Sequence, residues 1–282
     1  MDLALTYTNH LGQEVRIADG GHLHLMKSDQ QSDLFGHTYT YEQSGQRIWG
    51  LRLDARELTL PIGMFGGSLA ERTALYRALE ADAMAAECGV LAFHGYSLVC
   101  VPTAMSLGAW WFADGIEERK VTLVAPRPLW TREVVSSYGI APTPEGEGGD
   151  LDYPYDYAHD WRHGFVARRL RVDTVGAAEF RLVVYGPATN PYVTIAGNRY
   201  QVNVSVPSGS YLVLDTRDRT IRMVGELGGV TNCYADRVRG RRGGGHYAFQ
   251  PLPVGEHEVS SDNSFAFDVV IHDERTEPAW ES

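Results

Sequence analysis

Hydrophobic and polar residues alternate one by one in several short segments of the chain. Four such segments are residues 121–125, 180–184, 200–206 and 265–271. A period of two is typical of a strand that buries one face and exposes the other. Gly197-Asn198 and Pro207-Ser208-Gly209 flank the third segment and predict turns there. Short strands separated by turns at this spacing predict an antiparallel β-sandwich.

A single segment has the period of an amphipathic helix. Ser68 and Glu71 are spaced as a capping box, in which each side chain satisfies a free backbone N–H of the first turn. Apolar residues then recur on one face and polar residues on the other, namely Leu75, Leu79, Ala83 and Ala86 against Glu71, Arg72, Glu80 and Asp82. Gly89 supplies a C-terminal stop. We predict one helix, at residues 68–88, that lies across a sheet or a neighbouring subunit.

The composition changes between residues 136 and 163. Prolines and glycines alternate with acidic residues at 142–149, and a stretch rich in tyrosine and aspartate follows. We interpret this segment as a linker, so that residues 1–135 form an N-terminal domain and residues 164–282 a β-rich C-terminal domain. A second irregular segment, at residues 225–250, lies inside the C-terminal domain. A loop of this length in a compact domain is usually functional or disordered.

Composition and charge narrow the class of protein. Of the 282 residues, 44% are hydrophobic and 22% are charged, which is typical of soluble globular proteins. No apolar run approaches the roughly 20 residues of a membrane-spanning helix. The first residues lack the pattern of a signal peptide, so we expect synthesis and folding in a cytoplasm. The formal net charge of −11 argues against tight nucleic-acid binding, which depends on Lys and Arg.

Motifs for catalysis and metal binding are weak or absent. His159 and His163 have the spacing of two ligands on a helix, and His22 and His24 share one side of a predicted strand. A solvated polar surface explains both pairs better, because no HExxH motif is present. No nucleotide-binding glycine motif and no complete nucleophile motif occurs, and carboxylates are too numerous for a pair such as 117–118 to mark a glycosidase. We therefore expect no enzyme, no cofactor and no metal.

The chain contains three cysteines, Cys88, Cys100 and Cys233, and none of them forms a C-x-x-C motif. Three cysteines cannot all pair within one chain, so neither a disulfide framework nor a thiolate zinc site is expected. We predict free, buried thiols.

Two sets of motifs follow one another along the chain. In the first half, LTLPIG at 58–63 precedes the predicted helix, and GVLAF at 89–93 and LVAPRPLW at 123–130 follow it. In the second half, NPYVTI at 190–195 is followed by YLVLD at 211–215, TIR at 220–222 and PLPVGEH at 251–257. This order resembles the distal tail protein family of siphophages over nearly the whole chain. Glu256 stands where that family usually has Asn after the glycine of the last motif.

The resemblance implies a mainly β fold with one α-helix. The N-terminal β-rich belt domain would form a hexameric ring around the tail lumen, and the C-terminal domain would be a galectin-like antiparallel β-sandwich. The ring would join the tail tube protein to a tail-tip hub or to tail-fibre and receptor-binding proteins, in the tail of a virion assembled in the host cytoplasm. The family is structural, offers no catalytic residues to transfer, and has no membrane partner.

In that interpretation DNA only passes through the lumen. Six copies at −11 each would carry a formal charge of −66, and we expect acidic residues to line the lumen, where they repel phosphate. The alternative is a carbohydrate-binding module that acts in adhesion to the host surface. The chain has 15 tyrosines, and tyrosine rings suit stacking on sugars. A galectin-like fold by itself does not establish sugar binding.

Two groups of residues are candidates for contacts with subunits or partners. Trp110, Trp111 and Phe112 lie in a predicted strand or hairpin, where alternation turns at least one ring away from the core. The second group concentrates positive charge in a glycine-rich stretch and consists of Arg237, Arg239, Arg241 and Arg242. A solvated mobile loop and a contact with an acidic partner explain this group about equally well, and nucleic-acid binding ranks third.

Overall fold

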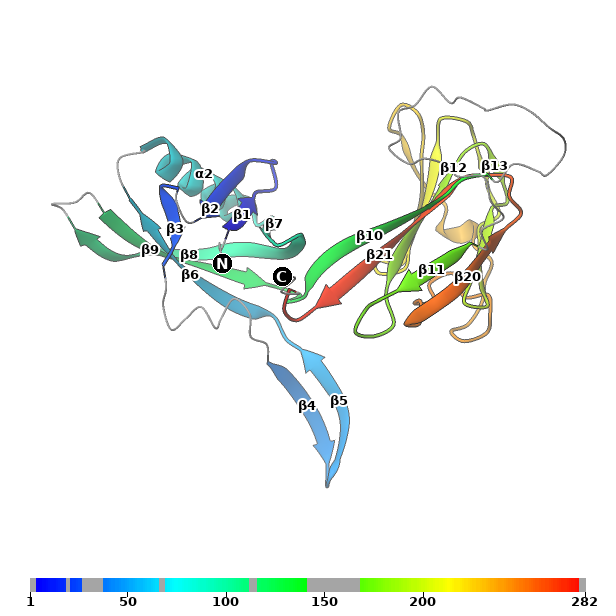
Figure 1. Ribbon diagram of the computed structural model, residues 1–282, viewed down its shortest axis with the longest axis horizontal. Coiled ribbons are helices and arrows are strands. Elements are labelled where there is room, and N and C mark those ends of the chain that lie inside the picture. Colours follow the sequence, from blue (N-terminus) through cyan, green and yellow to red (C-terminus); the bar gives the residue numbers. More distant parts are fainter. Residues whose placement is uncertain are drawn as a thin grey trace. The chain divides into compact units, whose positions relative to one another are not determined.

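The computed structural model describes residues 4–18, 21–26, 38–65, 69–111, 116–140 and 168–278, with only the backbone of Trp110 and Trp111. The fold is mainly β, which confirms the prediction, and α2 is the one α-helix among these residues. All strand pairs in this part of the chain are antiparallel, and Figure 1 shows how they follow one another.

The chain divides into two compact units. Unit 1 consists of Met1–Arg132 and Glu274–Ser282, and unit 2 consists of Glu133–Asp273. The chain passes from unit 1 to unit 2 within β10 (Trp130–Tyr138) and returns within β21 (Phe267–Arg275). Unit 2 is therefore inserted in the sequence of unit 1.

The start of the predicted linker differs from the structure, because residues 136–138 continue strand β10. Tyr138 holds the strand there, since its ring is buried and stacks on Phe267 at 4.9 Å between centroids. Its hydroxyl donates a 3.1 Å hydrogen bond to the Arg169 carbonyl. In unit 1, Glu274 near the end of β21 forms a 2.5 Å ion pair with Arg127. Residues 141–163 of the predicted linker lie outside the described residues.

Unit 1 is built on two sheets that share one long strand. Their strand orders are β2-β1-β7-β8 and β8-β9-β6-β3. A third sheet holds only β4 and β5. The elements are β1 (Ala4–Thr8), β2 (Glu14–Ala18), β3 (Leu23–Leu25), β4 (Tyr39–Ser44), β5 (Arg47–Leu53), β6 (Arg56–Met64), α2 (Leu69–Ala85), β7 (Gly89–Phe93), β8 (Tyr96–Trp111) and β9 (Ile116–Ala125).

Helix α2 covers the core of unit 1 and lies against β2 and β8. The predicted helix is confirmed, and Leu75 and Leu79 are buried as predicted. Glu71 and Glu80 are exposed as predicted, whereas the assignments of Ala83 and Asp82 are wrong, because Ala83 is exposed and Asp82 is fully buried. Ala86 lies beyond the helix and is exposed, and Ser68 of the capping box lies outside the described residues.

Asp82 is buried because three groups of the first hairpin bind it. The Tyr7 hydroxyl donates to Oδ2, and Oδ1 accepts the His10 backbone N–H at 2.9 Å and contacts His10 Nδ1 at 2.5 Å. Burial raises the pKa of Tyr7, and the hydrogen bond to Asp82 raises it further. Gly89 completes the site, since a Cβ there would overlap Oδ2 and the Tyr7 hydroxyl. The helix is thus fixed to β1 and the following turn by directional bonds.

Unit 2 is a sandwich of two main sheets. Their strand orders are β19-β18-β17-β12-β21 and β11-β20-β14-β15, and β13 pairs with β16. The remaining elements are β11 (Arg169–Val172), β12 (Phe180–Tyr185), β13 (Ala188–Thr189), β14 (Tyr192–Ile195), β15 (Asn198–Gln201), β16 (Ser205–Val206), β17 (Tyr211–Asp215), β18 (Thr220–Val224), β19 (Val230–Asn232), the 3-10 helix η2 (Tyr234–Asp236) and β20 (Gly255–Ser261).

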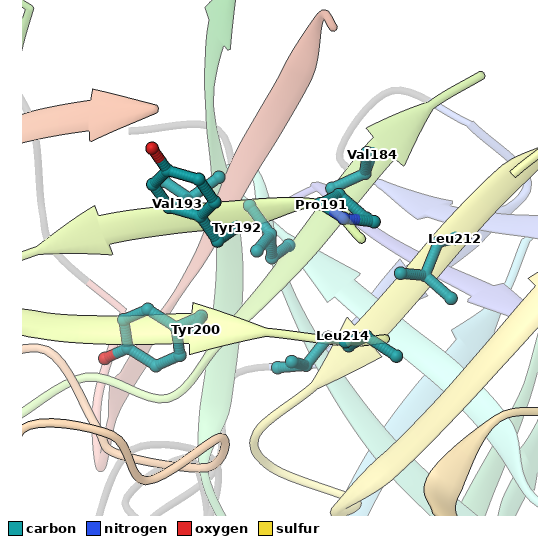
Figure 2. Close-up of a pocket in the computed structure, with 9 residues that line it drawn as sticks. Val184, Pro191, Tyr192, Val193, Tyr200, Leu212 and Leu214 are labelled. Atoms are coloured by element: carbon teal, nitrogen blue, oxygen red, sulfur yellow. The ribbon is translucent and has the colours of Figure 1, made fainter. Parts of the chain in front are cut away.

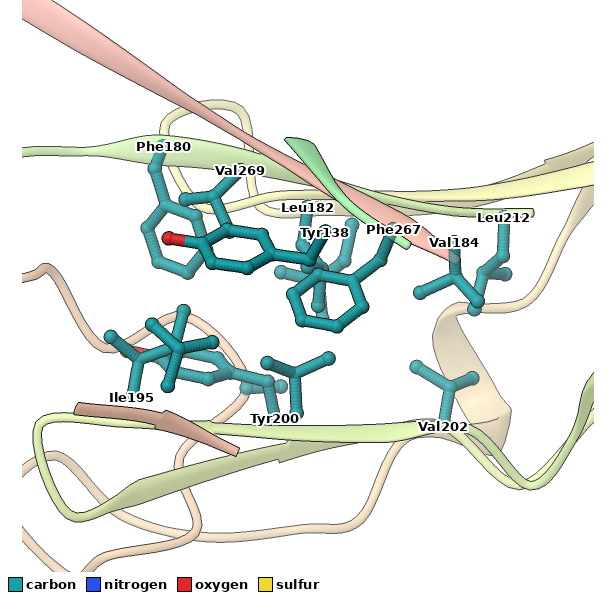
Figure 3. Close-up of a cluster of buried hydrophobic side chains, with 14 of the residues drawn as sticks. Tyr138, Phe180, Leu182, Val184, Ile195, Tyr200, Val202, Leu212, Phe267 and Val269 are labelled. Atoms are coloured by element: carbon teal, nitrogen blue, oxygen red, sulfur yellow. The ribbon is translucent and has the colours of Figure 1, made fainter. Parts of the chain in front are cut away.

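The core of unit 2 lies between these sheets. In Figure 3, Phe180 and Phe267 face Tyr200 and Val202 across the sandwich. The rings of Phe180 and Tyr200 meet edge to face at 5.0 Å between centroids, a favourable aromatic geometry. The predicted alternation at 121–125 and 180–184 is confirmed, because every second residue is buried, namely Val121, Leu123, Ala125, Phe180, Leu182 and Val184.

The segment 200–206 is not one strand, although its apolar residues alternate. It contains the end of β15 and all of β16, and the backbone between them bonds elsewhere. The Asn203 N–H donates to the Asp236 carbonyl at 2.8 Å, and Val202 forms an isolated bridge with Arg237. The predicted turn at Gly197 is present, with positive φ at Ala196 (51°) and Gly197 (76°), as a two-residue hairpin turn requires.

The cysteine prediction is wrong for one residue. Cys100 and Cys233 are buried, and Cys88 is exposed just after α2. Burial raises the pKa of the Cys100 thiol to about 12 and also raises the pKa of Cys233. All three are free thiols.

We predict that Asp82→Ala lowers the free energy of unfolding of unit 1 by about 3 kcal/mol, because it leaves buried donors without an acceptor. Urea denaturation at one protein concentration measures this change. Glu80→Ala is the matched control on the exposed side of α2 and is expected to change stability by less than about 0.5 kcal/mol. Equal effects of the two substitutions would contradict the assigned role of Asp82.

We predict that a thiol reagent labels the native protein at one cysteine. Cys88 reacts because it is exposed, whereas Cys100 and Cys233 react only after unfolding, because burial shields them and disfavours the thiolate. Absorbance-detected titration with a disulfide reagent counts the reactive thiols. Cys88→Ser is expected to remove the fast phase, and a fast phase that persists would contradict the assignment.

Candidate functional site

The cavity found between the described strands of unit 2 is too small for a ligand. The cavity in Figure 2, lined by Val184, Tyr192, Tyr200 and Leu212 among other residues, has a volume of about 10 Å³. This volume suits at most one water molecule, and the lining offers it few polar partners. An open depression of about 490 Å³ over β2, β3 and α2 is the larger hollow.

The described residues contain no group of three side chains that suits a metal ion. His22 contacts the Phe65 carbonyl through Nδ1 at 3.1 Å, and His24 packs edge-on against the Phe65 ring. These two histidines therefore have structural neighbours. The predicted alternative at His159 and His163 lies outside the described residues. No helix in the described ranges is long and apolar enough to cross a membrane.

The carboxylates at 117 and 118 do not form a catalytic pair. Glu117 is buried, and its oxygens contact Arg119, Arg72 (3.5 Å) and the Tyr76 hydroxyl (3.3 Å). Glu118 is the next residue of β9, so its side chain leaves the opposite face of the strand. Glu117 thus ties β9 to α2.

Trp110 and Trp111 form the end of β8. Their backbones pair with Glu117 and Ile116 of β9, so the strand expected around them is present. Phe112 lies outside the described residues. The contact with a subunit that we assign to these three aromatics remains a prediction.

Hydrogen bonds hold the arginine loop, residues 237–245, in one conformation. Arg237 stacks on Tyr234 at 3.8 Å and also donates to the carbonyl of that residue. Arg239, Arg241 and Arg242 are exposed and form no ion pair within the described ranges. The bonds that hold the backbone are Val238 N–H to Gln201 O (3.1 Å), Arg199 N–H to Gly245 O (2.8 Å) and Gly243 N–H to Gln250 Oε1 (2.9 Å).

This anchoring favours one interpretation of the loop. A surface held in place loses little conformational entropy when a partner binds. The bonds to β15 and Gln250 therefore argue against a mobile loop, and the contact with an acidic partner remains a prediction. The composition of the sequence revealed the loop's charge, but two of the bonds that order it join residues 37 and 46 positions apart in the chain.

Sequence reasoning missed the hairpin of β4 and β5. Figure 1 shows the pair as a separate hairpin, and every residue in it except Leu53 is exposed. Five large side chains are at least 42% exposed, namely Tyr39, Tyr41, Ile48, Trp49 and Leu51. The available signal was the alternation of aromatic and aliphatic residues on both sides of Ser44-Gly45.

The hairpin has one apolar and one polar face. Tyr39 pairs with Leu53 and Tyr41 with Leu51, and side chains of directly opposed residues share a face. On the other face, the Thr40 hydroxyl and Arg52 both donate to Asp54, at 2.5 and 2.7 Å. The unpaired residue Trp49 forms a bulge, and Arg47 stacks on its ring at 4.6 Å.

Comparison with solved structures finds the same architecture in phage proteins. A chain of the phage P2 baseplate in its activated conformation with Ca is 14% identical, with a TM-score of 0.60, over 99% of this chain and 100% of that chain. The SPP1 Dit protein, described as a paradigm of the hub adsorption apparatus in phages that infect Gram-positive hosts, is 11% identical, with a TM-score of 0.56, over 96% and 99%. The chain has the fold of these phage proteins.

The phage p2 baseplate with Sr gives a similar result, with 14% identity, a TM-score of 0.57 and 98% coverage of both chains. No family model and no curated protein sequence matches the chain. The shared phage fold extends over both units, since each alignment covers nearly the whole chain.

We predict that Gly240→Ala loosens the arginine loop, because a Cβ at Gly240 would lie 2.5 Å from the His246 carbonyl oxygen. Trypsin cleavage after Arg239, Arg241 and Arg242 is expected to be about fivefold faster, since cleavage requires local opening. Mass spectrometry of timed digests measures the rates. Gly229→Ala is the control, because its Cβ meets nothing within 4 Å. An unchanged rate in Gly240→Ala would show that the loop is not held as described.

Proposed function

We propose that this chain is a structural protein of a phage tail tip. It forms a hexameric ring that joins the tail tube to a tail-tip hub or to host-recognition proteins. The observation that carries this proposal is the nearly complete alignment with chains of phage baseplate and adsorption-hub structures. The alignment with the P2 baseplate chain covers 99% of this chain and 100% of that chain. The order of sequence motifs supports the same assignment. The surfaces support it as well, since described residues of both units include large exposed hydrophobic side chains, such as Trp49 in unit 1 and Tyr211 in unit 2.

Unit 1 forms the ring in this proposal. Its sheets end in the strands β2 and β3, and strand edges of this kind pair readily with strands of another copy. The end of β8 at Trp110 and Trp111, with Phe112 beyond it, adds an aromatic contact between subunits. Unit 2, the galectin-like sandwich, carries the arginine loop with Arg237, which binds an acidic neighbour in the tail tip.

DNA passes through the ring without being held. The charge of −11 per chain supports this part of the proposal, because acidic residues on the lumen repel phosphate. The protein acts in the virion tail, contributes no catalysis and carries no cofactor.

A carbohydrate-binding role is the second candidate, and a pair of tyrosines supports it. Tyr185 and Tyr211 lie directly opposite each other on β12 and β17, and each is 37% exposed. Their ring centroids are 6.5 Å apart, and the Tyr185 hydroxyl donates to Asp268 at 2.6 Å. Two adjacent rings beside a carboxylate suit stacking and hydrogen bonding to a sugar.

We predict that the purified chain forms a particle of about six copies, close to 188 kDa for six chains of 31.3 kDa. Light scattering coupled to size exclusion measures the mass, and negative-stain microscopy tests for a ring with a central hole. Glycan-array binding in the same preparation separates the two candidates. A single chain that binds a glycan would favour the carbohydrate module and would overturn the ring.

A further inference from the structure

The β4–β5 hairpin is unusual because no described helix or strand forms a second layer over it. A two-stranded hairpin is marginally stable in water unless its apolar face packs on something. Here Tyr41 and Leu51, which pair directly, are 61% and 64% exposed, and Ile48 beyond the bulge is 57% exposed. The hairpin therefore presents a contiguous apolar face to solvent.

The polar face explains how the hairpin keeps its shape without a second layer. The carboxylate of Asp54 accepts hydrogen bonds from the Thr40 hydroxyl and from Arg52, so both strands are tied near their base. The hydrogen bonds at Thr40 also lower the pKa of Asp54, with Arg52 acting in the same direction. A segment with one polar and one apolar face has the pattern of a strand pair whose apolar face is covered.

Charge identifies the partner. The hairpin and the adjoining Asp54 carry two acidic residues, Glu42 and Asp54, and two basic residues, Arg47 and Arg52, so they are neutral, whereas the whole chain carries −11. Copies of an acidic chain repel one another, and the repulsion is smallest where the contact is neutral and apolar. An acidic or basic partner would find no complementary charge on this face.

We propose that the apolar face of the β4–β5 hairpin packs against a second copy of this chain. This inference rests on the proposed ring and adds the segment that closes the contact. Tyr41 and Leu51 are its central residues, because large side chains at the centre of an interface dominate binding.

The test is the double variant Tyr41→Ser/Leu51→Ser in the full-length chain. Both side chains are exposed in the single chain, so circular dichroism and thermal unfolding at low concentration are expected to match the wild type. Assembly is expected to need at least a tenfold higher protein concentration, measured by mass photometry over a dilution series. Glu42→Ser/Arg47→Ser changes the polar face of the same hairpin, keeps its net charge at zero, and is expected to assemble like the wild type.

Cross-linking identifies the occupant directly. Leu51→Cys in a Cys88→Ser background, labelled with a photoreactive maleimide, is expected to give covalent dimers of this chain, and Glu42→Cys in the same background is not. If the double serine variant assembles at wild-type concentrations, or if Leu51→Cys gives no dimer in an assembled ring, the hairpin contact is overturned and the ring stands. A wild-type chain that stays single overturns both proposals.

Discussion

Paired strands turn alternate side chains to opposite faces, and this constraint decides where the protein can act. In unit 2 the inward side chains of the two sheets leave a cavity of only about 10 Å³. In unit 1 the inward side chains form a core, and α2 covers that core. A close-packed core leaves no space for a substrate. In the proposed function, partners meet the outward side chains, above all those of the β4–β5 hairpin and the arginine loop.

Asp82 fixes the orientation of α2 on the sheet of unit 1, which apolar packing alone does not do. Leu75, Ala78 and Leu79 bury one side of α2, but contacts of this kind are tolerant of small rotations of the helix. The bonds from Asp82 to Tyr7 and His10 have a fixed direction and join the helix to the first hairpin. Such a buried and fully bonded polar group defines one arrangement of helix and sheet.

The sequence predicted the fold class well and the surfaces poorly. Strands such as β9 and β12 were predictable because local alternation records which side is buried. The helical period placed Asp82 on the solvent-facing side of α2. Local periodicity carries no information about Tyr7, which binds Asp82 from 75 positions earlier in the sequence. The break between β15 and β16 depends on the bond of Asn203 to Asp236, 33 positions further along the chain. The hairpin was missed because an alternating pattern predicts a covered face, and only the fold shows that Tyr41 stays exposed beside the described residues of unit 1.

Unit 2 occupies residues 133–273, and unit 1 resumes at residue 274. A module inserted in this way is linked to its host by two strands, β10 and β21, that are neighbours in one sheet. The chain therefore crosses between the units at two places in its sequence, once within β10 and once within β21. These crossings mark a natural exchange point for evolution, where a different outer module can replace unit 2 while the residues of unit 1 stay unchanged.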